Sequence, residues 1–203
     1  LIDMKSPGLT VNPIIDMSGF HRFNQVFFDN VRVPKTNMVG EVNRGWYVGA
    51  TLLDFERSGV QYSASSQRAL EEMVQYARET KRNGRPLAED PTVRDRLAQL
   101  AVEIEVSRML SYHIAWMQSQ GQVPNKEASI GKLFGTELQQ RVASIWLGLL
   151  GPYAQLKPKS KLAPFQGYAV QSFLSSFSMT IAGGTSEIQR NIIATSGLGL
   201  PRG

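Results

Sequence analysis

From residue 45 onward the apolar residues of this chain recur every three or four positions, the spacing of α-helices that bury one face. A first helical pattern covers 46–80 and is broken only by Gly49 and Gly59, and a second follows Asp90-Pro91. The second and third stripes consist of Val93, Leu97, Leu100, Ile104, Ile114 and Met117, and of Phe134, Leu138, Val142, Ile145 and Leu149. Long amphipathic helices joined by modest loops predict an antiparallel helix bundle.

Capping residues and glycines predict where these helices begin and end. Asp90, followed by proline, is typical of a helix N-terminus, and Asn125 can cap the next helix, which Gly151-Pro152 ends. A shorter helix is expected over 165–179, and the last helix is expected to begin after Thr185. The tryptophans occupy apolar helical positions and are predicted to lie in the core: Trp46, Trp116 and Trp146.

Residues 1–43 follow a different pattern. Leu9–Ile14 and Phe23–Val33 are rich in β-branched and aromatic residues and are bounded by glycine and proline, which predicts strands. Two or three strands alone form a marginal sheet, so this segment needs the rest of a β-domain or a partner chain to pair with. The sequence therefore predicts a β segment at 1–43 and a helical domain at 44–203.

Composition excludes several classes of function. The 42% hydrophobic fraction suffices for a core, and no apolar run approaches the ~20 residues that a membrane span needs. The chain has no cysteine, which excludes disulfides and thiolate chemistry and is compatible with a reducing, cytoplasmic location. The two histidines, His21 and His113, lie far apart without metal-ligand spacing, so no metal site is predicted.

The net charge of +5 favours anionic partners. The basic clusters at 78–85 and 157–161 contain no interleaved aromatic residues, so we interpret them as solvated loops rather than as a nucleic-acid site. A phosphate-rich cofactor also suits this charge.

A glycine pair at 183–184 lies within the run Ile-Ala-Gly-Gly-Thr-Ser-Glu-Ile-Gln-Arg at 181–190. Consecutive glycines allow positive φ angles or the close approach of a ligand, and Thr185 can cap the helix that follows. The N–H groups at a helix start can bind an anion such as a cofactor phosphate. The alternative is an ordinary glycine-rich entry to a helix.

Glu56 is a candidate general base. In a helix its neighbours three and four positions away are apolar residues or glycine: Leu52, Leu53, Gly59 and Val60. A carboxylate among such neighbours loses hydration, which raises its pKa and suits it to accept a proton. Arg57 is better placed to pair with Asp54 than to neutralise Glu56. The alternative is a carboxylate that is exposed at the helix surface or paired with a lysine from elsewhere.

The run at 181–190, with the closing Leu198-Gly-Leu-Pro-Arg202, closely resembles the C-terminal signature of the acyl-CoA dehydrogenase family. Phe28-Asp-Asn-Val-Arg-Val-Pro34 resembles the last strand of that family's middle β-domain, and Leu53-Asp-Phe-Glu-Arg57 resembles the first helix of its C-terminal bundle. The resemblance extends over essentially the whole chain. It implies a mostly α fold, an antiparallel four-helix-type bundle at 44–203 preceded by a β-domain remnant at 1–43. We therefore expect the C-terminal part of a longer enzyme.

Members of this family are flavoenzymes that desaturate acyl thioesters between the α and β carbons. Many carry the catalytic glutamate directly before the Gly-Thr of the terminal motif, where this chain has Gly183. A second group, similar to isovaleryl- and long-chain acyl-CoA dehydrogenases, has its base on the first bundle helix before an arginine, as in Glu56-Arg57. The resemblance implies that Glu56 removes the α-proton while the β-hydrogen leaves as hydride to the flavin. Arg57 and Asp54 would support the substrate side of the pocket, or form only a structural ion pair.

The resemblance implies FAD as the cofactor. Three residues match FAD-binding positions of the terminal motif: Gly184, Thr185 and Glu187. Relatives often have glutamine at the position of Glu187. Thr80 and Asn83 stand where relatives often have an arginine and a phenylalanine for the FAD of a neighbouring subunit. Gly148-Leu-Leu-Gly-Pro152 stands in place of a Gln-x-x-Gly-Gly turn. These departures weaken the case for FAD across this interface without removing it.

The resemblance also implies partners and a role in fatty acid and lipid metabolism. These partners are acyl-CoA as substrate, electron-transfer flavoprotein as electron acceptor, and either further copies in a dimer or homotetramer or a related chain in a mixed oligomer. The changed cofactor positions leave a second hypothesis, a non-catalytic scaffold subunit of a mixed oligomer. A third is a flavin oxidase or monooxygenase of the same fold. We expect residues 1–203 alone to bind FAD poorly and to be inactive.

Overall fold

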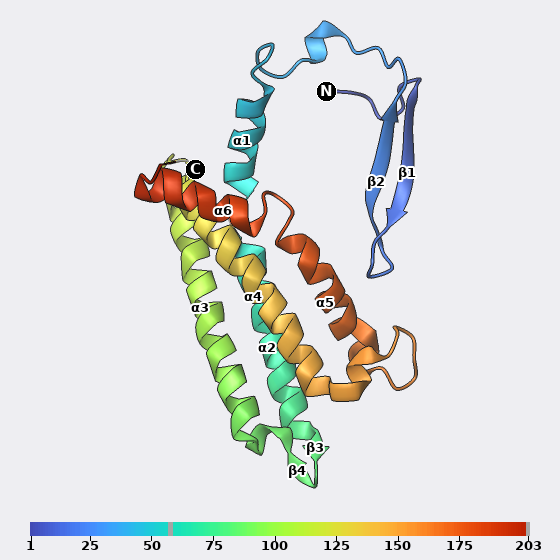
Figure 1. Cartoon of the computed structure of the whole chain (residues 1–203), viewed down its shortest axis with the longest axis vertical. Coiled ribbons are helices and arrows are strands. Elements are labelled where there is room, and N and C mark those ends of the chain that lie inside the picture. The colour runs from blue at the N-terminus through green and yellow to red at the C-terminus, as the bar shows by residue number, and fades with distance from the viewer. Residues whose placement is uncertain (57–58, 202–203) are drawn as a thin grey trace. The chain divides into compact units, whose positions relative to one another are not determined.

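The computed structural model describes residues 1–56 and 59–201, except for the side chains of residues 54 and 55. The chain forms two compact units, Leu1–Leu53 and Asp54–Gly203, each with its own internal contacts (Figure 1). The limit between them falls inside helix α1 (Gly45–Glu56). A domain boundary between residues 43 and 44, before this helix, remains our prediction.

The first unit contains an antiparallel two-stranded ribbon, β1 (Leu9–Ile15) and β2 (His21–Phe28). The strand expected to reach Val33 is shorter than predicted. It ends at Phe28 because Asn30 has a left-handed φ of 51°, which turns the chain out of the ladder. The residues before Pro34 therefore do not form the last strand that the family resemblance implied. A short 3-10 helix, η1 (Lys35–Asn37), and α1 follow.

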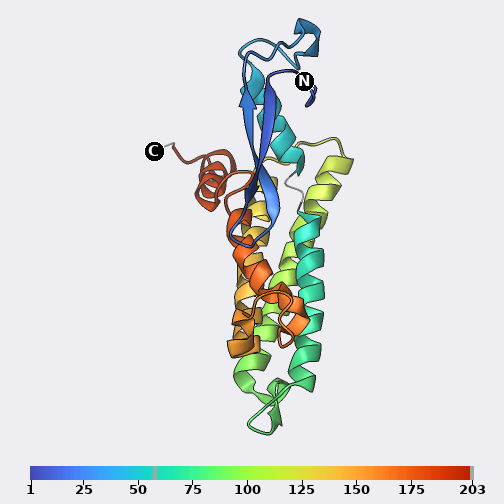
Figure 2. The same ribbon diagram turned by 90° about the vertical axis from the view of Figure 1, so that its right-hand side faces the viewer.

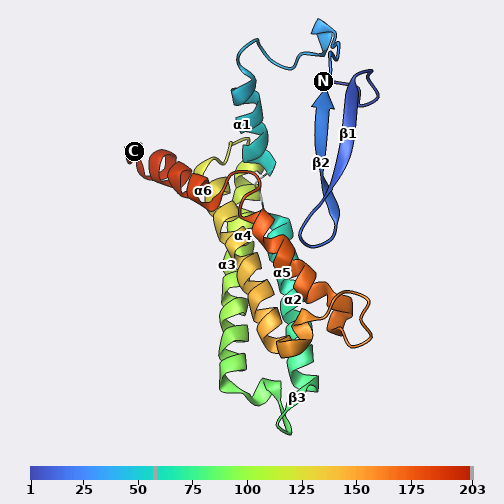
Figure 3. The same cartoon turned by 45° about the vertical axis from the view of Figure 1, so that its right-hand side comes forward.

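The second unit is a helix bundle, and the chain as a whole is mostly α. The helices are α2 (Val60–Glu79), α3 (Pro91–Ser119), α4 (Lys126–Leu150), α5 (Tyr168–Met179) and α6 (Ser186–Ile192). The short elements are β3 (Lys81–Arg82), β4 (Arg85–Pro86), η2 (Leu87–Glu89), η3 (Gly151–Gln155), η4 (Pro164–Gly167) and the π-helical η5 (Ile193–Gly197). α4 packs against α2, α3, α5 and α6, and α5 lies along α4 (Figures 1 and 3). Among the helices that the structure describes, none is long and apolar enough to cross a membrane.

The predicted apolar stripes form the core of the bundle. The large buried side chains are Met73, Leu100, Ile104, Ile114, Leu138 and Trp146. The ring of Trp146 lies 5.7 Å from that of Tyr76 and 4.7 Å from that of Phe165, measured between centroids. Such a cluster of three rings contributes packing beyond the area that it buries. The prediction for the other two tryptophans is wrong, since Trp46 and Trp116 are exposed.

α4 approaches its neighbours closely at two glycines. A Cβ atom at Gly135 would lie 2.9 Å from Cδ2 of Tyr62 in α2, and one at Gly131 would lie 2.7 Å from Cδ1 of Ile114 in α3. Both distances are shorter than ordinary contacts between carbon atoms. The small residues therefore allow the close packing that holds α4 in register with two helices.

Two of the predicted helix ends are confirmed. The Asp90 carboxylate accepts a hydrogen bond from the N–H of Thr92 at 2.8 Å, and Gly151 follows α4 with a φ of 58°. Asn125 does precede α4, but its backbone is helical rather than in the extended conformation that is typical of a cap.

The helix expected over 165–179 begins only at Tyr168. Phe165 and Gln166 have positive φ angles of 50° and 55°, which a right-handed helix does not allow. Gly167 follows with a φ of 80°. This left-handed segment places the Phe165 ring against Trp146, so a contact with α4 overrides the local helical pattern.

Candidate functional site

The double-glycine turn joins α5 to α6 at one end of the bundle, and the β3–β4 hairpin lies at the other end (Figures 1 and 2). Gly183 and Gly184 have φ angles of 67° and 100°, as their sequence predicted. The prediction that Thr185 caps the last helix is also confirmed. Its hydroxyl oxygen accepts a hydrogen bond from the N–H of Ile188 at 3.3 Å.

Two buried polar side chains hold this turn, and neither was among the predicted site residues. Nζ of Lys132 in α4 donates to the carbonyl oxygen of Gly184 at 2.7 Å. Nε2 of Gln189 in α6 donates to the carbonyl oxygens of Gly183 and Gly184, each at 3.1 Å. Lys132 is 2% exposed and Gln189 is 0% exposed. A lysine on the buried face of an amphipathic helix is the signal that could have revealed this contact.

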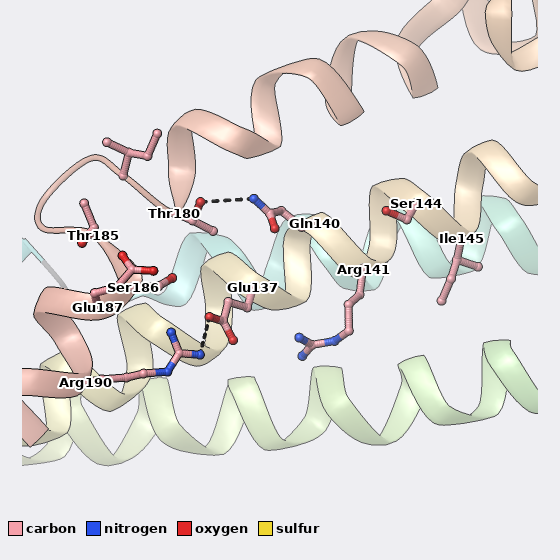
Figure 4. A pocket seen from close by; sticks show the side chains of 11 residues that line it. Glu137, Gln140, Arg141, Ser144, Ile145, Thr180, Thr185, Ser186, Glu187 and Arg190 are labelled. Carbon is pink, nitrogen blue, oxygen red and sulfur yellow. Dashed lines mark hydrogen bonds and ion pairs between the residues drawn. The ribbon is translucent and has the colours of Figure 1, made fainter. Parts of the chain in front are cut away.

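A pocket of about 690 Å³ lies between α4 and the segment formed by the turn and α6 (Figure 4). Its charged lining residues are Glu137, Arg141, Glu187 and Arg190. Arg190 pairs with Glu137 at 2.8 Å, and Arg141 pairs with Glu103 of α3 at 2.7 Å. The pairs join helices far apart in sequence, so no local pattern could have predicted them. With two carboxylates and two paired guanidinium groups, the pocket is polar but close to neutral.

The carboxylate of Glu187 is stabilised in its charged form. Its own backbone N–H is the largest cause of a lowered pKa, followed by a hydrogen bond from the Thr185 hydroxyl. The positive charges of Arg190 and Lys132 lower the pKa further. Glu187 is therefore an acceptor at neutral pH, in a position where the family often has a glutamine that can also donate.

The residues predicted to act on the substrate lie outside this pocket or outside the described structure. Glu56 is the last residue of α1 and its side chain is exposed, so its helix neighbours do not by themselves remove it from water. The side chain of Asp54 and all of Arg57 lie outside the described residues. The catalytic role of Glu56, and the roles of Arg57 and Asp54, remain predictions. Of the predicted cofactor residues, Thr185 and Glu187 line the pocket and Gly184 belongs to the adjoining turn.

The positions at which the resemblance implied altered FAD contacts lie toward the opposite end of the bundle. Thr80 directly follows α2, and Asn83, with a φ of 54°, lies between β3 and β4. Gly148 is exposed near the end of α4, next to Leu149, whose carbonyl oxygen accepts a hydrogen bond from Arg82 at 3.4 Å. These positions are therefore separate from the pocket beside the double-glycine turn.

Within the described part of the chain, no three His, Cys, Asp or Glu side chains come together in a way that could hold a metal ion. The polar groups of the pocket are instead a mixture of carboxylates, guanidinium groups, hydroxyls and one amide. This mixture can bind an organic ligand that both donates and accepts hydrogen bonds.

Comparison with known proteins agrees with this arrangement. IpdE1, an acyl-CoA dehydrogenase of Mycobacterium tuberculosis, is 31% identical over 204 residues, which cover 100% of this chain and 50% of the relative. Cyclohexane-1-carbonyl-CoA dehydrogenase of Geobacter metallireducens is 31% identical over 96% of this chain and 50% of its own length. The crystal structure of the ChsE4-ChsE5 complex from Mycobacterium tuberculosis superposes with a TM-score of 0.88 and 31% identity, over 100% of this chain and 52% of the other.

The chain thus spans about half the length of these relatives. The family described as "Acyl-CoA dehydrogenase, C-terminal domain" matches residues 43–198, which include the whole bundle and the double-glycine turn. The match agrees with the terminal motif, the positive φ angles of its glycines and the threonine cap. The chain therefore belongs to the acyl-CoA dehydrogenase family.

Proposed function

We propose that the protein containing this chain catalyses the FAD-dependent α,β-dehydrogenation of an acyl-CoA thioester and passes the electrons to an electron-transfer flavoprotein. The observation that carries this proposal is the double-glycine turn together with Thr185 and Glu187, which follow it and line a pocket of about 690 Å³. That volume falls within the roughly 300–1,000 Å³ typical of ligand pockets.

The polar groups beside the turn suit the flavin ring and the ribityl chain of FAD better than its pyrophosphate. Gln140 donates to the hydroxyl of Thr180 at 3.1 Å and lines the pocket together with the Thr185 hydroxyl (Figure 4). These groups and the Glu187 carboxylate offer both donors and acceptors, which suits the flavin ring and the ribityl hydroxyls. The arginines of the pocket are already paired with glutamates, so they suit a pyrophosphate less well. When bound, FAD supplies the hydride acceptor for the reaction.

Glu56 is the base in this proposal. Gly183 has no side chain at the position where many relatives carry the catalytic carboxylate, and the Glu56-Arg57 pair matches the alternative position on the first bundle helix. Glu56 takes the α-proton of the thioester, with Arg57 and Asp54 on the substrate side. Because Glu56 is exposed in residues 1–203, the removal of water around it has to come from the substrate or from parts of the protein beyond this segment.

The test is Glu56→Gln in the whole protein, with reduction of an artificial electron acceptor by acyl-CoAs as the assay. We expect turnover to fall by at least about 100-fold while the flavin content stays unchanged, because the amide cannot accept the proton. Glu71→Gln, at another exposed glutamate in a helix, is the matched control and should retain full turnover. Full activity of Glu56→Gln would end the catalytic assignment. A wild-type protein without flavin would end the proposed function.

An exposed apolar face on α3 supports an oligomer. Val102, Val106, Met109 and Trp116 follow helical spacing and are between 43% and 60% exposed. Contiguous exposed apolar side chains mark interaction surfaces more often than free surfaces. We propose that this face contacts another chain, either a second copy or a related dehydrogenase chain.

A non-catalytic scaffold subunit is the second candidate function. The changed positions Thr80, Asn83 and Gly148 favour it, and one solved relative is a complex of two chains with different names. In this case the protein should co-purify with an intact dehydrogenase chain and hold no flavin when expressed alone. Yellow, active protein from a single chain would exclude it, and slow reoxidation by oxygen would then separate a dehydrogenase from an oxidase.

A further inference from the structure

We propose that Lys132 is a positioning residue, which together with Gln189 fixes the double-glycine turn in the geometry that the reaction requires. The pair is called the carbonyl clamp, because its side chains donate three hydrogen bonds to the carbonyl oxygens of Gly183 and Gly184. The reaction part of this proposal rests on the proposed function, whereas the structural part does not.

Lys132 lies in the interior, where its burial is costly. It is 2% exposed in the middle of α4, and lysine is among the residues that are least often buried. An amino group removed from water needs hydrogen-bond partners, and the carbonyl oxygen of Gly184 at 2.7 Å is part of that compensation. An apolar residue would fill this helix position at lower cost, so the lysine points to a specific task at the turn.

Gln189 follows the turn in the sequence, whereas Lys132 precedes it, and both contact the carbonyl oxygen of Gly184. The amide nitrogen of Gln189 donates to two carbonyl oxygens, each at 3.1 Å. The amide oxygen of Gln189 would repel these carbonyl oxygens, so the nitrogen is the end of the amide that faces the turn. Its Oε1 is buried without a hydrogen-bond partner among the described residues. A buried orphan oxygen is unfavourable, so the side chain is held in place by the contacts of its nitrogen.

The turn needs such contacts because two consecutive glycines leave its backbone more conformational freedom than any other pair of residues would. Gly183 and Gly184 have φ angles of 67° and 100°, and glycine populates many other values. A Cβ built at Gly183 would meet no described atom within 4 Å, so crowding at that position does not fix the turn. The N–H of Ser186 donates to the carbonyl oxygen of Thr180 at 3.0 Å and closes the loop, but the glycine carbonyls are oriented by the clamp.

The clamp acts on the pocket through the next residues of the chain. Gly184 directly precedes Thr185, whose hydroxyl caps α6 and lines the pocket. The charge of Lys132 is also felt at Glu187, on the same rim. A displacement of about 1 Å in groups that align reactants can cost about 100-fold in rate. Losing the clamp should therefore slow the chemical step more than it weakens substrate binding.

The experiment compares Lys132→Met with Lys132→Arg in the whole protein, and Lys126→Met is the matched control. Lys126 lies in the same helix but is exposed and pairs with Glu127. The first readout is amide hydrogen exchange over residues 182–186, which needs no flavin. We expect it to accelerate at least about tenfold in Lys132→Met, to change little in the control, and to be partly restored in Lys132→Arg, which keeps a donor.

The second readout is the rate of flavin reduction at saturating acyl-CoA, divided by the flavin content. We expect Lys132→Met to lower it at least about tenfold, with KM changed less than about threefold. A merely structural lysine would lower the flavin content or the Tm and leave the rate per bound flavin unchanged. If Lys132→Met fails to fold, Gln189→Met removes the other two hydrogen bonds and carries the same expectations.

The outcomes separate the two proposals. Unchanged hydrogen exchange at the turn would overturn the clamp, whatever the protein catalyses. Faster exchange with an unchanged rate per bound flavin would overturn the positioning role alone. A wild-type protein that binds no flavin and oxidises no acyl-CoA would refute both the proposed function and the positioning role. The hydrogen-exchange data would still decide whether the clamp exists.

Discussion

The β1–β2 ribbon and the three long helices α2 to α4 are both rich in apolar residues, but they use them differently. In the ribbon only Leu9 is partly buried, and every other residue of the two strands is exposed. In the helices Met73 and Leu138 have no exposed surface. Helices with one apolar stripe can cover one another within a single segment, whereas a two-stranded ribbon leaves both faces open. The bundle therefore contains its own core, and the ribbon needs another surface to cover it.

The sharpest test of this difference is the removal of one large core side chain. Trp146 is 1% exposed and packs against Tyr76 and Phe165, so Trp146→Ala should destabilise the 203-residue chain by about 3–5 kcal/mol. Trp116→Ala, at a tryptophan that is 56% exposed, should cost less than about 1 kcal/mol. Urea unfolding followed by circular dichroism measures both. Equal losses would mean that the described core does not carry the stability.

The glycines of α4 give the next largest effect. Gly135→Ala should destabilise the chain by about 1–3 kcal/mol, because the new Cβ would lie 2.9 Å from the Tyr62 ring. Gly148→Ala is the matched change in the same helix, and there the new Cβ meets no atom closer than 3.8 Å. It should stabilise the chain by about 0.5–1 kcal/mol, since alanine is the better helix former. Chemical denaturation of the two variants should give shifts of opposite sign.

A change in the ribbon should have a smaller effect on unfolding. Phe27 is 46% exposed in β2, so Phe27→Thr should alter the unfolding free energy of the 203-residue chain by less than about 0.5 kcal/mol. The same urea titration gives the answer. A loss comparable to that of Trp146→Ala would show that the ribbon is covered by a contact that its exposure does not indicate.

The smallest effects concern one carboxylate in each unit, the half-buried Asp16 and the exposed Glu187. The Ser18 hydroxyl is the largest cause of the lowered pKa of Asp16, whereas the Thr185 hydroxyl is only the second cause at Glu187. Ser18→Ala should therefore raise the pKa of Asp16, and Thr185→Val should raise the pKa of Glu187. Carboxyl titration by NMR measures both.

The sign of the accompanying pH dependence follows from the direction of these shifts. Both carboxyls have a folded-state pKa below the ordinary value near 4. Their contribution to stability is complete above that ordinary value and is lost as the pH falls through the folded-state pKa. The variants should therefore lose less stability on acidification than the parent chain. A greater loss in either variant would contradict the assignment.

Features that depend on a few neighbouring residues could be predicted from the sequence. The apolar stripes of α3 and α4, the caps at Asp90 and Thr185, and the stop at Gly151 were found because spacing and capping are local. The start of α5 was missed because Phe165 packs on Trp146, a contact made across the fold. Helical periodicity marks an apolar face but not what covers it, and so the exposure of Trp116 was missed as well.

The same distinction holds for the candidate site. The turn and its flanking Thr185 and Glu187 could be predicted because they form one continuous motif. The Glu137–Arg190 pair and the contact of Lys132 with Gly184 could not, because each joins α4 to residues about fifty positions later. The assignment of Glu56 as the base rests on the family pattern, and the Glu56→Gln variant tests it.

The environment of Trp146 also makes its fluorescence a probe of packing in the bundle. Its indole is 1% exposed and lies in edge-on and tilted contact with two other rings, while Trp46 and Trp116 are exposed. In the monomeric 203-residue chain, a small polar quencher such as acrylamide should quench the emission of Trp46 and Trp116 first and leave the short-wavelength emission of Trp146. The remaining fluorescence would then follow, in real time, the loosening of α4 from the segment that carries Phe165.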